Sequence, residues 1–123
     1  MLSSGTRSAL AWLAQLVAAG ILGTAGVAKL LAAPDPVALF TLLGAEPWGR
    51  VLVGSLELLS TLLLLLPRTA VFGGGLAVLL MLGAIATHLF KIGVAYGGDP
   101  TLFIMACLVL VASMATILLR KRA

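Results

Sequence analysis

Charged residues are scarce in this sequence of 123 residues: they make up 10% of it, whereas apolar residues make up 62%. The mean hydropathy is +1.22. A soluble domain carries about 25% charged residues, so this composition indicates a membrane protein. The length leaves room for one domain. We therefore expect a single transmembrane domain over residues 1–123.

Cysteine and histidine each occur only once, at Cys107 and His88. One cysteine excludes an internal disulfide and a CxxC redox pair. A single histidine without cysteine neighbours is a poor metal ligand set, so we expect no metal site. Aromatic residues are only 6% and scattered, which gives no stacking platform for nucleic acid. The net charge of +4 is better explained by membrane orientation and contact with anionic lipid.

Four apolar stretches have about the length needed to cross the ~30 Å hydrocarbon core of a bilayer. They cover approximately residues 9–31, 50–66, 70–90 and 101–119. Backbone groups in lipid must be hydrogen-bonded within their own segment, which favours helices. The alternating ten-residue segments of a membrane barrel do not occur. The sequence therefore predicts an all-α protein, an integral membrane four-helix bundle.

The connection between the first two stretches contains a further apolar segment, residues 37–43, which is too short to span. We expect a short interfacial helix here, with Asp35 as its N-cap, Pro36 in its first turn and Gly44 at its end. An ordinary ordered loop is the alternative.

Basic residues are unequally divided between the two sides that four spans define. One side carries Arg7, Arg68, Arg120, Lys121 and Arg122 without an acid; the other carries Lys29, Arg50 and Lys91 together with Asp35, Glu46 and Asp99. Basic residues are enriched in cytoplasmic flanks. We therefore expect both termini to be cytoplasmic.

Glu57 lies inside a predicted span, where a carboxylate must be neutralised, paired or facing a polar cavity. Helical spacing places Arg50, Gly54 and Glu57 on one stripe. Lys29 and His88 lie in the same half of the bundle as Glu57, the half away from the predicted cytoplasmic termini. The half near the termini has almost no ionisable groups within the spans. We predict a polar cluster of these four ionisable residues that is a candidate ligand or proton site. A structural ion pair is the alternative.

Small residues indicate where the first two spans approach each other. The predicted packing positions are Gly20, Gly23, Gly26 and Gly54. Close approach of helix backbones at glycine is a main source of helix association in lipid. Gly26 and Gly54 each lie about one turn before Lys29 and Glu57, so we predict a Lys29–Glu57 ion pair with His88 adjacent.

Four segments together resemble the DoxX-like family of small bacterial membrane proteins, which is related to the MauE-type proteins. They are residues 26–30, the connection with Phe40, Gly44 and Pro47, residues 54–59 and residues 81–88. The resemblance implies a four-helix bundle in the bacterial inner membrane. It also implies association with redox systems, such as quinone-linked thiosulfate oxidation or maturation of a periplasmic enzyme. The family's glycine–glutamate segment maps onto Gly54 and Glu57, and its lysine onto Lys29.

Three functions remain open. The first is an accessory subunit of a quinone-linked or periplasmic redox system, in which His88 or Lys29 donates to a quinone carbonyl and Glu57 sets the charge. The second is a small oligomeric transporter or channel that uses Glu57, although no polar path continues through the inner half. The third is a membrane assembly or structural protein.

We expect no covalent cofactor and no enzyme activity of the chain alone. The expected partners are the lipid bilayer, a membrane or periplasmic redox protein, and a second copy of the chain.

Overall fold

The computed structural model describes residues 2–121, and within this range the chain is helical without a strand. The four long helices are α1 (Ser4–Leu30), α3 (Trp48–Leu64), α4 (Ala70–Thr87) and α5 (Thr101–Arg120). The short helix α2 (Pro34–Leu42) joins α1 to α3. A π-helical turn, η1 (His88–Ile92), continues α4, and a 3₁₀ turn, η2 (Tyr96–Gly98), precedes α5. The predicted all-α fold is confirmed.

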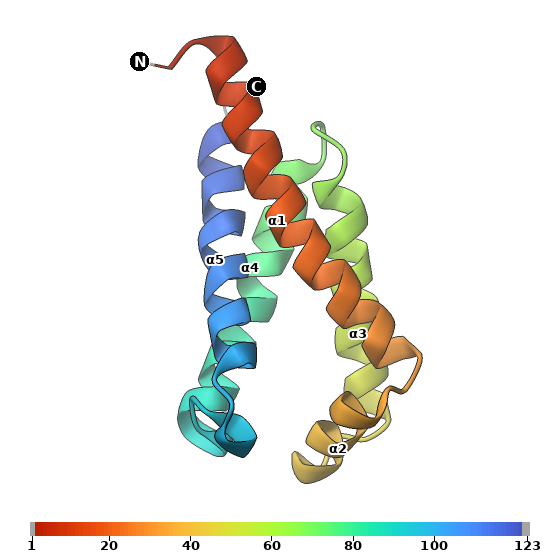
Figure 1. Cartoon of the computed structure of the whole chain (residues 1–123). Helices are drawn as coiled ribbons and strands as arrows, with labels where there is room; N and C mark the ends of the chain where they lie inside the picture. Colours follow the sequence, from red (N-terminus) through yellow and green to blue (C-terminus); the bar gives the residue numbers. More distant parts are fainter. Residues whose placement is uncertain (1, 122–123) are drawn as a thin grey trace.

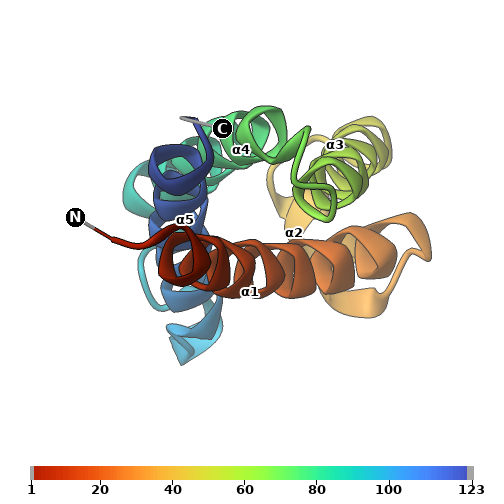
Figure 2. The same ribbon diagram turned by 90° about the horizontal axis from the view of Figure 1, so that it is seen from above.

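The four long helices form a ring in the order α1, α3, α4, α5, as the view from above shows (Figure 2). Helices α1 and α4 lie across the ring from each other, and each packs mainly on α3 and α5. The first turn of α1, the connection 65–69 and the last turn of α5 lie at one end, which we call the terminal end (Figure 1). Helix α2 and the turns η1 and η2 lie at the other, which we call the α2 end.

Three helical segments are long and apolar enough to cross a membrane: α1, α5, and α4 continued by η1 to Ile92. Helix α3 has 17 residues, or about 25 Å at 1.5 Å per residue, which is near the lower limit for a span. The outer surface of the ring is rich in exposed large apolar side chains, among them Leu13, Phe72, Leu79, Phe90 and Val111. Such a surface suits contact with lipid rather than with water.

Small side chains allow the helices to approach closely. The buried core consists of Ala18, Ala19, Leu22, Leu64, Ala77, Met81, Ala106 and Val109. A Cβ atom on Gly73 would lie 2.7 Å from the backbone nitrogen of Leu64, and one on Gly26 would lie 3.0 Å from the carbonyl oxygen of Gly54. These two glycines therefore hold α4 against α3 and α1 against α3.

The prediction that Gly20 is a packing position is wrong. A Cβ atom there would meet nothing within 4 Å, whereas one on Gly23 would lie 3.3 Å from the Thr61 side chain. A spacing of three residues turns a helical position by about 60° at each step, because a residue advances about 100° around the axis. Gly20 therefore lies about 120° away from Gly26 and outside the face that packs on α3.

The short helix α2 is present, but Asp35 is not its N-cap. The helix begins at Pro34, and Ala33 is the N-cap. Proline lacks an amide hydrogen and suits the first helical position, so the helix starts one residue before Asp35. The predicted end is confirmed, because the helix finishes at Leu42 and Gly44 follows with a φ of 74°.

Asp99 anchors the start of α5, although the N-cap residue of this helix is Pro100. Its Oδ1 accepts hydrogen bonds from the backbone N–H of Thr101 at 2.9 Å and from the Thr101 hydroxyl at 2.6 Å. These bonds hold the pKa of Asp99 below its ordinary value, because they favour the ionised carboxylate.

We predict that Gly73→Ala destabilises the bundle by about 1–3 kcal/mol, the usual cost of overpacking a core. The added methyl group would press on the α3 backbone, which cannot move as a side chain can. The measurement is thermal unfolding in mild detergent, followed by circular dichroism. Gly75→Ala is the matched control, because a Cβ atom at Gly75 meets nothing within 4 Å. Equal unfolding temperatures for the two variants would contradict the close α3–α4 packing.

Candidate functional site

Lys29 of α1 and Glu57 of α3 form an ion pair, as the helical spacing predicts. The Nζ atom of Lys29 lies 3.0 Å from Oε1 of Glu57, and only 17% and 5% of the two side chains are exposed. Oε1 has no hydrogen-bond partner of suitable geometry in spite of this short distance. The opposite charges of the two side chains attract each other across this contact.

Gly54 is the reason that the two charges can meet. A Cβ atom on Gly54 would lie 2.9 Å from Cβ of Lys29 and 3.3 Å from the carbonyl oxygen of Gly26. Any larger residue at position 54 would push α1 away from α3 just where the lysine crosses between them. An unpaired ion at this depth would cost several kcal/mol, so the close approach and the ion pair support each other.

Arg50 belongs to a separate ion pair and does not contact Glu57. Its Nε and Nη2 atoms donate to the two carboxylate oxygens of Glu46, at 2.8 and 3.0 Å, and Nη1 donates to the carbonyl oxygen of Lys29. Glu57 lies about 10 Å deeper along α3, whereas Glu46 is only four residues from Arg50. Glu46, just before α3, was not predicted as the partner of Arg50, although a spacing of four residues is typical of an ion pair.

His88 lies where α4 passes into η1 and is only 5% exposed. Its Nδ1 atom lies 3.0 Å from the carbonyl oxygen of Gly93, so Nδ1 carries the hydrogen of this bond. In the neutral ring, Nε2 is then an acceptor. The edge of the ring packs on Phe103 with 5.6 Å between the ring centres. The π-helical turn at η1 is a feature that occurs frequently at functional sites.

A cavity of about 420 Å³ lies between the helices near the α2 end, and three of the four predicted site residues line it. Its polar lining residues are Lys29, Glu57, Thr87 and His88. All other lining residues are apolar or glycine, and they come from α1, α2, α3, α4, η1 and α5. Arg50 is not part of the lining. The structure therefore brings Glu57, Lys29 and His88 to one apolar chamber and leaves Arg50 beside it.

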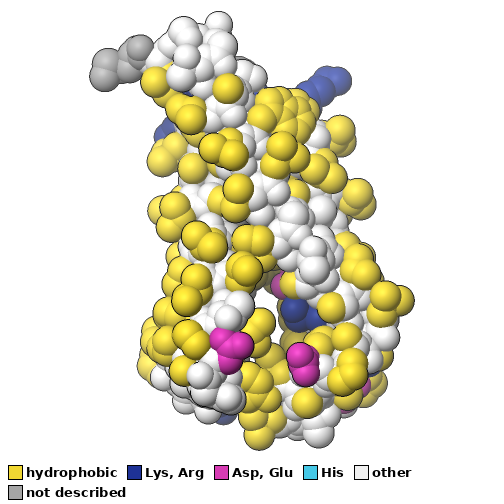
Figure 3. Space-filling view, in the orientation of Figure 1, with side chains coloured by type: hydrophobic (Ala, Val, Ile, Leu, Met, Phe, Trp, Pro, Cys, Tyr) yellow, Lys and Arg dark blue, Asp and Glu magenta, His cyan; other side chains and the backbone are white. Residues whose placement is uncertain are grey.

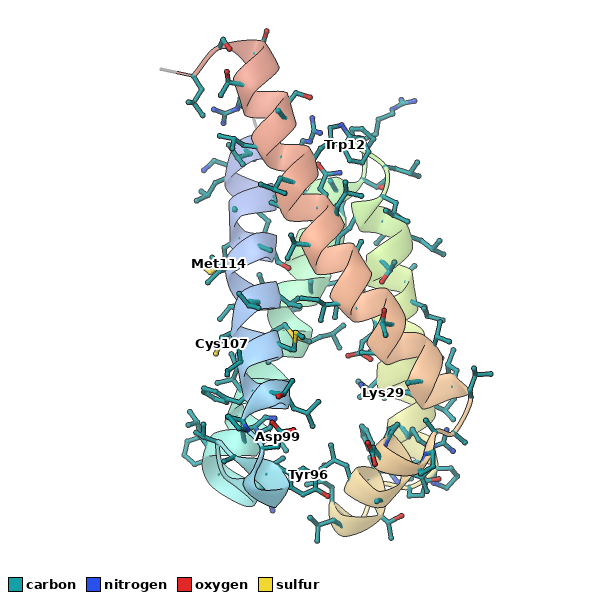
Figure 4. The ribbon with its side chains drawn as sticks, in the orientation of Figure 1. Trp12, Lys29, Tyr96, Asp99, Cys107 and Met114 are labelled. Carbon is teal, nitrogen blue, oxygen red and sulfur yellow. The ribbon has the colours of Figure 1, made fainter. Side chains whose placement is uncertain are left out.

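The cavity opens to the side of the bundle. In the space-filling view, a hollow in the lower half has basic and acidic side chains in its wall and hydrophobic side chains around it (Figure 3). With side chains drawn as sticks, Lys29 lies on one side of this space, and Tyr96 and Asp99 lie toward the other (Figure 4). The side of a membrane bundle faces lipid, so a molecule dissolved in the bilayer can reach the polar groups.

The contacts of the ion pair lead to a prediction about stability. Lys29→Met leaves Glu57 buried without a partner, and we expect a loss of about 3 kcal/mol, at the low end for breaking a buried pair. The double variant Lys29→Met with Glu57→Leu is expected to recover most of that loss, because apolar replacement of both partners is often neutral. Thermal unfolding in detergent measures both effects.

The exposed Lys91→Met variant is the control, since it removes a lysine near the same end without leaving a buried charge. If the double variant is as unstable as Lys29→Met alone, the uncompensated carboxylate of Glu57 is not the cause of the lost stability.

Comparison with known protein families places residues 13–116 in the DoxX-like family. This segment contains the ion pair and every residue that lines the cavity. No curated protein and no solved structure matches the chain. The match covers most of the sequence, and it agrees with the apolar helices of spanning length. The chain is therefore a helical membrane protein that belongs to the DoxX-like family.

Proposed function

We propose that the chain is an accessory subunit of a membrane redox system and that it binds a lipid-soluble quinone in the cavity. The observation that carries this proposal is a small polar cluster in the wall of an otherwise apolar cavity that opens to the side of the bundle. The volume of about 420 Å³ falls within the roughly 300–1,000 Å³ of small-molecule sites. A quinone combines a flat ring with two carbonyl oxygens and a hydrocarbon tail, which suits these walls and this access route.

Lys29 is the best donor to a quinone carbonyl. Its ammonium group has three hydrogens, and the ion pair with Glu57 leaves some of them free to donate. Glu57 balances the lysine charge and offers a carboxylate that can take up or release a proton close to the ligand. A bound quinone would supply the two-electron chemistry, while the residues of the chain hold its oxygens and exclude water.

His88 has a different role from the one expected from the sequence. Because Nδ1 donates to Gly93, the neutral ring can only accept a hydrogen bond through Nε2. A quinone carbonyl is also an acceptor, so neutral His88 does not suit it. The hydroxyl group of the reduced quinol is a donor, so it suits the accepting Nε2 atom of neutral His88. Lys29 and His88 thus favour the oxidised and the reduced ligand respectively.

We further infer that the electrons come from a partner protein, because the chain has a single cysteine and no other redox-active pair in its sequence. With both termini cytoplasmic, the α2 end and its cavity would face the periplasmic side of the bacterial inner membrane. The electron donor is then a membrane or periplasmic redox protein. A second copy of the chain is a further proposed partner, but it cannot be the donor because it has no redox pair either. The narrower relation to MauE-type proteins stays a prediction.

Transport through one copy of the chain has less support. The core residues Leu22, Leu64, Met81 and Val109 are buried and apolar, and Leu22 and Met81 also line the cavity. The buried polar side chains Gln15, Ser60 and Thr116 each donate to a backbone carbonyl oxygen rather than to one another. Within residues 2–121, no hydrogen-bonded chain of side chains therefore leads from Glu57 to the terminal end.

The test is to purify the protein in mild detergent and to identify bound quinone by mass spectrometry. Ala25 lines the cavity, so we expect Ala25→Phe to lower the quinone content at least tenfold by filling the chamber. Val27→Phe is the matched control on the same helix, because Val27 is 46% exposed and does not line the cavity.

An unchanged quinone content in Ala25→Phe would rule out binding in this cavity. Absence of quinone from the wild-type protein, together with normal quinone reduction in membranes that lack it, would favour a structural role instead. Proton or solute flux in liposomes that is lost in Glu57→Gln would favour transport.

A further inference from the structure

The terminal end holds a second polar cluster, which is separate from the cavity. Arg120, at the end of α5, donates from Nε to Oε1 of Gln15 at 2.7 Å. Its guanidinium carbon lies 5.5 Å from the centre of the Trp12 ring. Gln15 is fully buried and donates in turn to the carbonyl oxygen of Leu64 at 2.7 Å. The guanidinium is therefore held in a fixed place between α1, α3 and α5.

The contacts of Arg120 within the described chain are all with neutral groups. An amide oxygen accepts one of its hydrogens, an indole ring lies against its face, and the buried Nη2 atom has no hydrogen-bond partner within residues 2–121. Arg120 is half-buried, and a cation that is partly removed from water is better stabilised beside an anion. Here the described chain does not provide one.

The distribution of acidic side chains explains why none of them reaches Arg120 within residues 2–121. The four acidic residues of the sequence are Asp35, Glu46, Glu57 and Asp99. They lie in or beside α2, at the start of α3, in the ion pair with Lys29, and just before α5. All of these positions are toward the α2 end. The terminal end, by contrast, carries the described basic residues Arg7, Arg68, Arg120 and Lys121.

The neighbours of Arg120 are suited to the headgroup layer of a membrane. Trp12 lies at the terminal end, near the connection between α3 and α4 (Figure 4). Tryptophan is enriched at the membrane–water boundary, where its ring is partly apolar and its N–H can bind polar groups. Arg7 adds a second guanidinium at the same place, because it donates to the carbonyl oxygens of Leu118 and Leu119 in the last turn of α5.

We propose that Arg120 is the centre of a binding site for the phosphate group of an anionic phospholipid. Guanidinium binds phosphate through charge-assisted hydrogen bonds. Nη2 is enclosed by the protein, so the phosphate would be met by the part of this half-buried side chain that reaches the surface. Gln15 and Trp12 hold the guanidinium in position, and Arg7 raises the local positive potential. Basic pockets between membrane helices are known to suit such headgroups. The exposed Arg68 and Lys121 can attract anionic lipid only diffusely.

The first test is native mass spectrometry of the protein released from nanodiscs that contain phosphatidylcholine and phosphatidylglycerol. We expect the wild type to retain one phosphatidylglycerol, Arg120→Gln to lose it, and Arg120→Lys to retain it weakly. Arg68→Gln removes the same charge from an exposed position and is expected to behave as the wild type. Equal retention in Arg120→Gln and Arg68→Gln, or equal retention of the two lipids by the wild type, would overturn the proposal.

A second measurement does not need an Arg120 variant. The sequence has two tryptophans, so Trp48→Phe leaves Trp12 as a single fluorescent reporter beside the guanidinium. In phosphatidylcholine nanodiscs, adding phosphatidylglycerol should shift Trp12 emission in a saturable way. Inorganic phosphate, added to the same concentration of negative charge, should not shift the Trp12 emission. A response to inorganic phosphate alone would identify a free-anion site, and no response to either would remove the lipid site.

Discussion

The Lys29–Glu57 pair joins α1 to α3 at a depth where either charge alone would be costly, and much of the bundle is arranged around it. The two side chains meet only because Gly26 and Gly54 let the helix backbones come together beside them. The pair in turn makes it possible for a carboxylate to lie in an apolar wall. The polar cluster in the wall of the cavity therefore depends on helix packing at two glycines.

The fold and this contact could be predicted from the sequence because both follow from one-dimensional spacing. Apolar run lengths define the helices, and the spacing of Gly54 and Glu57 places them on one face. The same reasoning fails where it ignores rotation, as at Gly20, whose three-residue spacing turns it away from α3. It also fails where a nearer partner competes: Arg50 pairs with Glu46, four residues away, because Glu57 lies seven residues and about 10 Å further along α3.

The cavity itself could not be predicted, because spacing along a helix does not give the tilt between helices. Hydrogen bonds at the terminal end tie α1 to α5 through Arg7 and join α5, α1 and α3 through Arg120 and Gln15. The helix pairs separate toward the α2 end, where α2 and η1 fill part of the space (Figure 1). The hydrogen bond that sets the tautomer of His88 depends on the π-helical turn, for which the sequence gives no signal.

The two ends of the bundle thus differ in how their buried charges are balanced. At the α2 end, the chain supplies both signs, so its cavity is nearly neutral and can accept a ligand that brings only hydrogen-bonding groups. A lysine that shares one contact with a carboxylate can still donate to a carbonyl oxygen, so such a ligand can bind without breaking the ion pair. At the terminal end, residues 2–121 supply only cations, and our proposal is that a bound anion supplies the missing sign. The two proposals, an uncharged ligand at one end and an anionic headgroup at the other, both rest on this division of charge.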